Sequence, residues 1–575
     1  MTINRRLLPY LLVTWLPLAT QSRLLAQDED AGAGRWQARS MVETKFGIVA
    51  TSQTLASAAG ARILEMGGNA IDAAIAANAV LGVVEPMSDG MGGDLFAIVY
   101  EAKTGKLYGL NASGWAPTGL TIEALEKQKL TKMPQRGIYS VTVPGAVAGW
   151  EALRSKFGTM PFSRLLAPAI YYAENGFPVT EIIGAAWQGA TKTLSANKGA
   201  KDTYLPDALA PKVGAIFRNR DLAGSLRLVA ARGRDGFYKG ATAQALIREA
   251  KEDGVEWTAG DLAEFQPEWV TPISTTYRGW TVFELPPNGQ GMAALAMLNM
   301  MERFPLSQYG QDSAKALHVM IEAKKLAYSD LLRYVGDPRF TKTPVDRLLA
   351  KDTAAMRAAL ITPNKAACTV TPTELSWLAR LPGADTIYMS AMDREGNMVS
   401  LIQSNYSGFG SGIVAPGTGF ALQNRGALFS LERGHPNALA PRKRPLHTII
   451  PAFMQKGDTR IAFGIMGGWN QSQAHAQFVS NVVDFGMNIQ AALEAPRFTK
   501  LTFDGCDLFM ETRVPEAVVK ELQSMGHAIK PAGPYSGRMG GGQAVMSNAD
   551  GIHFGASDPR KDGAAVPENP AFENR

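Results

Sequence analysis

The stretch Ala70–Val84 consists almost wholly of Ala, Ile, Val and Leu, and Asn69 stands directly before it. An asparagine in that place is a typical helix N-cap, so the sequence predicts a helix that begins at Ala70. A helix that is apolar on nearly all sides is buried on most of them. The chain is therefore expected to form a layered core, in which this helix packs between or against β-sheets.

A second pattern, later in the chain, predicts a β-hairpin. The apolar, β-branched runs Thr386–Met392 and Met398–Gln403 flank a short turn that contains Gly and Asn. The segment before them, Ala350–Pro382, is rich in Lys, Thr, Pro and Ala and is expected to be loose and exposed. A loose segment that leads straight into a buried strand is unusual in a continuous chain. It makes sense if the chain is cut there.

Residues 1–26 have the pattern of a secretory signal peptide. Arg5 and Arg6 precede the apolar run Leu7–Ala19, and small residues follow it. The run is short for a membrane span, and two prolines interrupt it. We therefore expect export to the periplasm or the exterior, with no membrane association after the signal is removed.

Composition argues against several classes of function. The formal net charge is +6, and the three arginines of residues 1–26 leave only +3 for the remainder. No basic tract occurs, so no nucleic-acid partner is expected. Cys368 and Cys506 are too few for a disulfide scaffold or a zinc cluster, and the six histidines show neither HxxH nor HExxH spacing. A phosphate-binding GxxxxGK[ST] loop is also missing from the sequence. Neither a metal nor a cofactor is expected.

Other local patterns predict further elements. The cluster Asp89–Asp94 indicates a tight turn that another backbone approaches closely, rather than a phosphate cradle, because no lysine accompanies it. The strands Leu95–Glu101 and Lys106–Asn111 are expected to form a hairpin. Further predicted helices are Ser52–Met66, Gly145–Phe157, Phe162–Asn175, Ala241–Glu252, Thr258–Phe265, Met292–Met300 and Ala314–Ala327.

Many separate blocks of the sequence, in one order, resemble the gamma-glutamyltranspeptidases, which are members of the N-terminal-nucleophile hydrolase superfamily. The likeness runs from about Gly47 to Arg560. The matching blocks include GGNAIDAAIA (Gly67–Ala76), VPGAVAGW (Val143–Trp150), YVGDPRF (Tyr334–Phe340), NALAPRKRPL (Asn437–Leu446) and GASDPR (Gly555–Arg560).

This resemblance implies an α+β fold, a four-layer αββα sandwich made as one precursor that cuts itself. A large subunit, 27–385, and a small subunit, 386–575, would together form one domain. The cut between Asp385 and Thr386 would make Thr386 the N-terminal catalytic residue. Its freed α-amino group, with an ordinary pKa of about 7.7–8.0, suits the work of a general base.

The resemblance implies catalytic roles for three further residues. Ser404 would hydrogen-bond to the nucleophile, and the N–H groups of Gly467 and Gly468 would form an oxyanion hole. Asn424 matches a position in the substrate pocket. From the residues alone each has an ordinary alternative: a strand serine, a simple turn and a capped turn.

The chain departs from the family chiefly where family enzymes grip a γ-glutamyl group. An arginine that binds the substrate carboxylate is replaced by Ser113, and two adjacent serines that help to grip that carboxylate are replaced by His447 and Thr448. An asparagine is replaced by Tyr406. The glutamine and aspartate that hold the substrate α-amino group align with Arg425 and Leu428. Near the nucleophile, Tyr388 replaces the usual histidine.

The activity implied is hydrolysis or acyl transfer of γ-glutamyl or related small-molecule amides through an acyl-enzyme on Thr386. Because Arg425 would repel an ammonium group, the departures predict an acyl group with a carboxylate but no α-amino group, of the oxamate or glutaryl type. Arg425 as a structural arginine is the alternative for that residue. An inactive binding or scaffold protein is the alternative for the chain, although Thr386, Ser404, Gly467 and Gly468 together argue against it.

Overall fold

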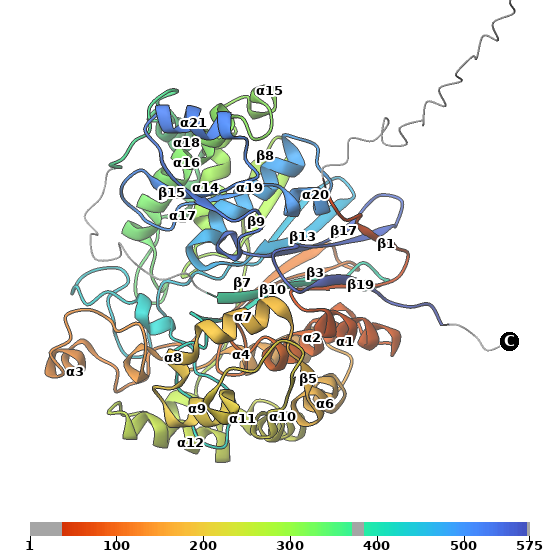
Figure 1. The fold of residues 1–575 in the computed structure, drawn as a ribbon, viewed down its shortest axis with the longest axis vertical. Coiled ribbons are helices and arrows are strands. Elements are labelled where there is room, and N and C mark those ends of the chain that lie inside the picture. The colour runs from red at the N-terminus through yellow and green to blue at the C-terminus, as the bar shows by residue number, and fades with distance from the viewer. Residues whose placement is uncertain (1–36, 371–384, 572–575) are drawn as a thin grey trace, which may run out of the picture. The chain divides into compact units, whose positions relative to one another are not determined.

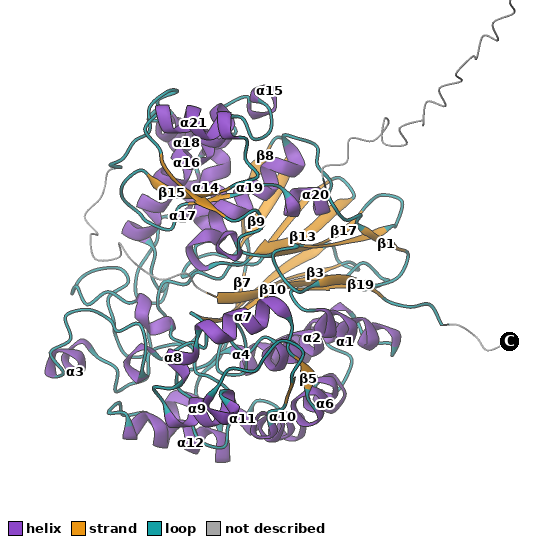
Figure 2. Ribbon diagram, viewed as in Figure 1, coloured by secondary structure: helices purple, strands orange, loops and turns teal. Residues whose placement is uncertain are grey.

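The computed structural model describes residues 37–370 and 385–571, so the predicted signal peptide lies outside the described residues. Two seven-stranded sheets form the centre of the fold (Figure 2). Neighbouring strands in both sheets are antiparallel. The first sheet has the order β19 (Ala564–Pro567), β2 (Ile48–Thr51), β10 (Asp385–Met392), β11 (Met398–Tyr406), β3 (Asp94–Glu101), β4 (Lys106–Ala112) and β7 (Glu268–Val270). The second has the order β1 (Val42–Thr44), β18 (His553–Ser557), β17 (Gly542–Ser547), β13 (Thr459–Ile465), β12 (Ala452–Lys456), β9 (Trp280–Glu284) and β8 (Ile273–Tyr277).

Helices cover the outer face of each sheet (Figure 1). The first sheet is covered by α1 (Thr54–Glu65) and α2 (Ala70–Val84), and α2 contacts β2, β10 and β11. On the second sheet, α14 (Gly291–Met301) packs on β8 and β9, and α19 (Gln471–Val483) packs on β13. An apolar cluster that includes Phe96, Ile402, Phe453 and Ala462 joins the two sheets. These layers are the predicted four-layer αββα sandwich.

The remaining described helices are α3 (Ile122–Lys127), α4 (Ala146–Phe157), α5 (Phe162–Leu165), α6 (Ala167–Asn175), α7 (Glu181–Gly189), α8 (Thr191–Leu194), α9 (Lys198–Tyr204), α10 (Arg220–Arg232), α11 (Asp235–Tyr238), α12 (Gly240–Glu252), α13 (Ala259–Ala263), α15 (Leu306–Tyr309), α16 (Ala314–Tyr334), α17 (Val345–Leu349), α18 (Lys351–Ala358), α20 (Ile489–Glu494) and α21 (Glu516–Ser524). Two small sheets are formed by β14 (Phe498–Thr499), β15 (Asp507–Glu511) and β16 (Ala528–Ala532), and by β5 (Phe177–Pro178) and β6 (Ile216–Phe217). No described helix is both long and apolar enough to cross a membrane.

The apolar helix predicted from Ala70 is confirmed as α2. All of its residues are buried, and Asn69 and Asp72 form a capping box at its first turn. The predicted hairpins β3–β4 and β10–β11 are also present. At the turn before β3, a Cβ on Gly92 would overlap the carbonyl oxygen of Ala421. The close backbone approach expected for the glycine cluster is therefore confirmed.

Three predicted segments differ from the structure. The single helix predicted over 162–175 is two helices, because Pro168 has no N–H to donate to Arg164 and the helical ladder breaks there. The helix predicted over 314–327 continues as α16 to Tyr334, because Leu331 and Leu332 keep its later turns packed in the core. In the segment 350–382, which was expected to be loose, the structure describes residues 350–370, and these include α18, whose Ala354 and Ala358 are buried. Residues 371–382 lie outside the described residues.

Candidate active site

Thr386 lies near the start of β10, at an irregularity in its pairing with β11. Asp385 pairs with Tyr406 and Ile387 pairs with Gln403, so Thr386 is one residue opposite two. Such a bulge re-aims a side chain at the edge of regular pairing. The Thr386 side chain is buried, and its Oγ1 lies 3.0 Å from Oγ of Ser404. The structure therefore brings the predicted nucleophile and its predicted hydroxyl partner into contact.

The end of β11 fixes the position of Ser404. The backbone N–H of Tyr406 donates a 2.7 Å hydrogen bond to Ser404 Oγ. Tyr406 itself has φ of 75°, an uncommon backbone conformation for a non-glycine residue. Residues held in this region cost free energy and occur often at functional sites. Here it occurs at the last residue of β11, two positions after Ser404.

Gly467 and Gly468 lie between β13 and α19, with φ of 125° and 61°. Side chains are strained in these conformations, so glycine suits both positions. Within the described part of the chain, neither N–H group donates a hydrogen bond. Two neighbouring unpaired N–H groups at the approach to a helix can bind a negatively charged oxygen.

Gln290 connects this turn to the rest of the site. It is fully buried, and its Nε2 donates hydrogen bonds to the carbonyl oxygens of Thr448 and Gly468, the latter at 2.8 Å. Thr448 Oγ1 in turn accepts a 2.6 Å hydrogen bond from Arg425 Nη1. Gln290 thus couples the position of the glycine turn to that of the arginine.

Arg425 is fully buried, and its guanidinium lies 4.4 Å from the centre of the Tyr406 ring. Burial lowers the pKa of Arg425 to about 10, which leaves the group charged near neutral pH. Only Nη1 is hydrogen-bonded among the described residues, whereas Nε and Nη2 have no hydrogen-bond partner there. Nε and Nη2 form one edge of the planar guanidinium, and such an edge matches the two oxygens of a carboxylate.

Asp94 is the acidic neighbour of Arg425, at 4.0 Å from Nε, which is too far for a hydrogen bond. Burial raises the pKa of Asp94 to about 7, although Arg425 opposes the shift. Its Oδ1 accepts the Gly114 N–H at 2.9 Å, and its Oδ2 lies 2.9 Å from His447 Nε2. Burial holds the pKa of His447 well below its usual range. Because Ile449 N–H donates to His447 Nδ1, neutral His447 donates from Nε2 to Asp94.

The other predicted pocket residues lie in the same region, but their side chains are committed. Ser113 Oγ donates to Asn111 Oδ1 at 2.7 Å and accepts from Asn288 Nδ2 at 3.2 Å. The Asn424 side chain accepts from Ser407 N–H at 3.0 Å and donates to the Gln135 carbonyl at 2.7 Å. Asn424 precedes the 3₁₀ turn Arg425–Leu428 but does not cap it through its side chain.

Tyr388 occupies space that the opposite sheet leaves open. Its hydroxyl lies 2.7 Å from Ser400 Oγ, and its ring lies where a Cβ on Gly464 would stand. Gly464 is on β13, three residues before Gly467. The tyrosine that replaces the family's usual histidine is therefore accommodated by a glycine in the facing sheet.

Sequence reasoning missed Asp94 and Gln290 as parts of this site. Asp94 could have been suspected, because an acid directly follows the glycines of a tight turn and begins a buried strand. Gln290 lies in a loop before α14, where nothing in the local sequence distinguishes it from an ordinary loop residue. Its role depends on contacts with residues more than 150 positions away.

Among the described residues, one group of side chains has the ligand types that bind metal ions, and none of its members belongs to the site around Thr386. Ligand atoms of His318, Glu322 and His527 lie within 4.8 Å of one another. His318 Nδ1 and His527 Nε2 are already 2.8 Å apart, and Lys325 Nζ donates to Glu322 at 2.6 Å. An ammonium against the carboxylate disfavours a cation there, so this cluster is explained as a polar network around α16.

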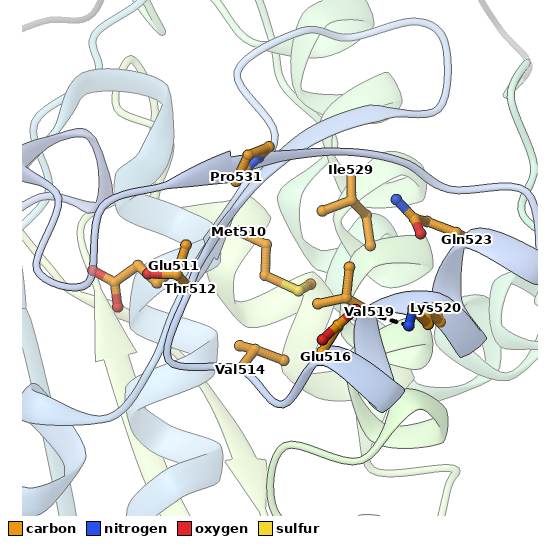
Figure 3. A pocket seen from close by; sticks show the side chains of 10 residues that line it. All are labelled: Met510, Glu511, Thr512, Val514, Glu516, Val519, Lys520, Gln523, Ile529 and Pro531. Atoms are coloured by element: carbon orange, nitrogen blue, oxygen red, sulfur yellow. Dashed lines mark ion pairs between the residues drawn. The ribbon is translucent and has the colours of Figure 1, made fainter.

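A surface cavity of about 360 Å³ lies between β15, β16 and α21 (Figure 3). Met510, Val514, Val519 and Ile529 give it an apolar floor, and none of the residues assigned to the active site lines it. It carries no paired nucleophile and base, and it is distinct from the site around Thr386.

The chain is similar to known proteins over most of its length. The gamma-glutamyltranspeptidase family model matches residues 56–568. The chain is 36% identical to the glutathione hydrolase-like YwrD proenzyme of Bacillus subtilis, over 92% of this chain and 99% of that protein. It is 35% identical to the oxamate amidohydrolase proenzyme of Klebsiella pneumoniae, over 90% and 98%. The crystal structure of cephalosporin acylase from Bacillus halodurans superposes with a TM-score of 0.86 at 42% identity, covering 94% of this chain and 99% of that one.

Proposed function

Because the chain belongs to the gamma-glutamyltranspeptidase family of enzymes that act on amide bonds, we propose that it is a threonine amide hydrolase for acyl groups that carry a carboxylate. Thr386 is the nucleophile, and Arg425 holds the substrate carboxylate. The observation that carries the proposal is the buried Nε–Nη2 edge of Arg425, which makes no hydrogen bond among the described residues. This guanidinium lies over the Tyr406 ring, at the end of the strand that bears Ser404.

The enzyme is made as a precursor, as the proenzyme names of its relatives suggest. Thr386 Oγ1 attacks the Asp385 carbonyl carbon, the peptide C–N bond breaks, and water hydrolyses the resulting ester. The products are a large subunit, 27–385, and a small subunit, 386–575, whose strands remain paired in one domain. The cut leaves Thr386 with a free α-amino group as its own general base.

In turnover, this amino group accepts the Thr386 hydroxyl proton while Oγ1 attacks the substrate amide carbon. The hydroxyl of Ser404, at 3.0 Å, helps to hold Oγ1 in place. The N–H groups of Gly467 and Gly468 stabilise the negative oxygen, a contribution typically worth about 10²–10³ in rate for each donor. The amine leaves with the proton, and water then hydrolyses the acyl-enzyme ester.

The charges of the pocket select the acyl group. A buried guanidinium with unpaired donors is costly, and a substrate carboxylate would complete its hydrogen bonding. Asp94 is the acidic residue next to the Arg425 guanidinium, and both of its carboxylate oxygens already accept hydrogen bonds. The pocket therefore supports a carboxylate better than an ammonium. Oxamate and glutaryl amides have this chemistry, and an oxamate amidohydrolase is among the relatives.

Export to the periplasm or the exterior remains part of the proposal. It is supported by the signal-like pattern of residues 1–26 and by a disulfide between Cys368 and Cys506. Disulfides persist mainly in oxidising compartments. Two cysteines are too few to indicate a disulfide scaffold, and no local sequence pattern predicts this single bond.

The substrate proposal is tested with three anilides of matched length on the processed protein: glutaryl, γ-glutamyl and the uncharged pentanoyl compound. We expect the highest kcat/KM with the glutaryl anilide. A clear preference for the γ-glutamyl anilide would contradict the proposal and assign Asp94 to the substrate ammonium. The absence of any turnover by a correctly cut protein would favour the inactive binding protein instead.

A further inference from the structure

We propose that the disulfide between Cys368 and Cys506 is a covalent cross-link between the two subunits of the processed enzyme. The inference rests on the proposed cut, because Cys368 precedes Thr386 and Cys506 follows it. The two Cα atoms are 4.7 Å apart, and 138 positions separate the residues in the sequence. Cutting the chain between them leaves the disulfide as a bond between two polypeptides.

Besides the disulfide, hydrogen bonds join the backbone around Cys368 to residues of the proposed small subunit. Ala366 N–H donates to the Met525 carbonyl at 2.8 Å, and Gly505 N–H donates to the Cys368 carbonyl at 2.8 Å. These contacts flank the disulfide on both chains. The last described part of the large subunit is thus docked on the 505–525 region at the point where the disulfide forms.

Helix α16 supports the same segment from the large-subunit side. Glu322 accepts the Ala367 N–H at 3.1 Å, and Lys325 Nζ donates to the Ala367 carbonyl at 2.9 Å. His318 lies 2.8 Å from both the Thr362 carbonyl and His527. The buried His318–Glu322–His527 network, which the catalytic mechanism does not use, therefore presents Cys368 to Cys506.

The bond forms by thiol–disulfide exchange with an external disulfide oxidant. The two cysteine thiols lose two electrons and two protons, one Cys368–Cys506 bond forms, and the oxidant's disulfide is reduced to two thiols. An exported protein meets such oxidants in its compartment. Because Cys368 is exposed, a small thiol reductant can reach the bond in the folded protein.

The cross-link changes how the enzyme recovers from unfolding. Without it, two separate chains must meet again, so recovery depends on concentration. With it, pairing of the subunits is an intramolecular event with a high effective concentration. The wild-type protein is expected to regain the same fraction of activity after about tenfold dilution during refolding from urea, whereas an uncross-linked protein regains less.

The direct test is a denaturing gel of exported wild-type protein, alkylated with iodoacetamide and run with and without reductant. We expect one band without reductant and two bands with it, and mass spectrometry should find the Cys368 and Cys506 peptides joined. The Cys368→Ser and Cys506→Ser proteins should each give two bands in both lanes. The Thr386→Ala protein should give one band in both lanes.

The outcomes separate this inference from the proposed function. Two bands without reductant, with both cysteines alkylated, would overturn the cross-link and leave the cut intact. One band with reductant would overturn the cut, and with it the cross-link between subunits. The alkylation and mass spectrometry use wild-type protein, so the result does not depend on whether a serine variant folds.

Discussion

In the proposed mechanism the hydroxyl of Thr386 acts twice, first on its own peptide bond and then on the substrate. We expect Thr386→Ala to abolish both steps, because no other group replaces the attacking oxygen, and Thr386→Ser to retain both at reduced rates. A reducing gel measures the cut, and release of aniline measures turnover. Efficient cutting of the alanine variant would show that another residue is the nucleophile.

Arg425 is expected to act on substrate affinity more than on chemistry. Charge-assisted hydrogen bonds contribute about 1.5–3 kcal/mol, so Arg425→Gln should raise KM for the glutaryl anilide roughly 10- to 100-fold. Arg425→Lys keeps the charge but loses the planar edge, and it should recover only part of this loss. Steady-state kinetics with the pentanoyl anilide provide the control, since that substrate has no carboxylate. An equal loss for both substrates would indicate a structural arginine.

If Arg425 binds a substrate carboxylate as proposed, the neighbouring Asp94 should make that binding depend on pH. Burial raises the pKa of Asp94 to about 7. Below that pH Asp94 is neutral, and no negative charge on Asp94 offsets the positive charge of Arg425. As the pH rises through about 7, Asp94 becomes negative and repels the substrate carboxylate. KM for the glutaryl anilide should then rise by about tenfold, while KM for the pentanoyl anilide should change little.

Two charged or titratable neighbours of Asp94 should not contribute to this pH dependence. Arg425 remains charged, and burial keeps His447 neutral, so neither changes state in this range. Asp94→Asn retains an acceptor for the Gly114 N–H but loses the acceptor for the His447 Nε2–H, and its KM, whatever its level, should no longer vary across this range. If the variation persists in Asp94→Asn, another group causes it.

At the scale of elements, the turn before β3 depends on contact between backbones. A Cβ on Gly92 would overlap the Ala421 carbonyl, and overpacking of this kind typically costs about 1–3 kcal/mol of unfolding free energy. Gly224 lies in α10 with open space around it, so Gly224→Ala should stabilise the protein by about 0.5–1 kcal/mol. Urea unfolding of the Gly92→Ala and Gly224→Ala proteins measures the difference in their free energies of unfolding. Equal unfolding midpoints would contradict the close approach of the Gly92 and Ala421 backbones.

Elements with a strong local pattern were predictable from the sequence. The apolar composition and the cap of α2 identify the helix and its first residue, and alternation identifies β10 and β11. The order of strands was not predictable in this way, because β2 and β19 pair across more than 500 positions. The length of α16 was underestimated because its buried Lys324 and Lys325 resemble a solvent-facing end.

In the candidate site, too, some residues were predictable from the sequence and others depend on contacts between distant segments. The family resemblance supplied Thr386 and Ser404, and the structure brings their hydroxyls together. It also supplied Arg425, but the free edge of that arginine is visible only once Thr448 and Tyr406 are placed around it. Asp94 and Gln290 contribute through packing between distant segments, which local sequence patterns do not reveal.

At the scale of the whole molecule, the two proposed subunits are interleaved. In the first sheet, β10 and β11 lie between β2 and β3 of the large subunit, and β19 returns to pair with β2. Residues 27–385 and 386–575 expressed separately should therefore stay unfolded, because each exposes unpaired strands and half of a core. Size-exclusion chromatography and limited proteolysis check this. A stable, separately folded small subunit would contradict it.

The contact between Tyr388 and Gly464 has a consequence for how this sequence can change over time. The ring on one sheet fills the volume that a side chain on the other would need. A larger residue at 464 becomes acceptable only after the tyrosine has been replaced by something smaller, and the reverse order of changes is blocked. The two positions are therefore epistatic, and variants of this chain should alter them as a pair.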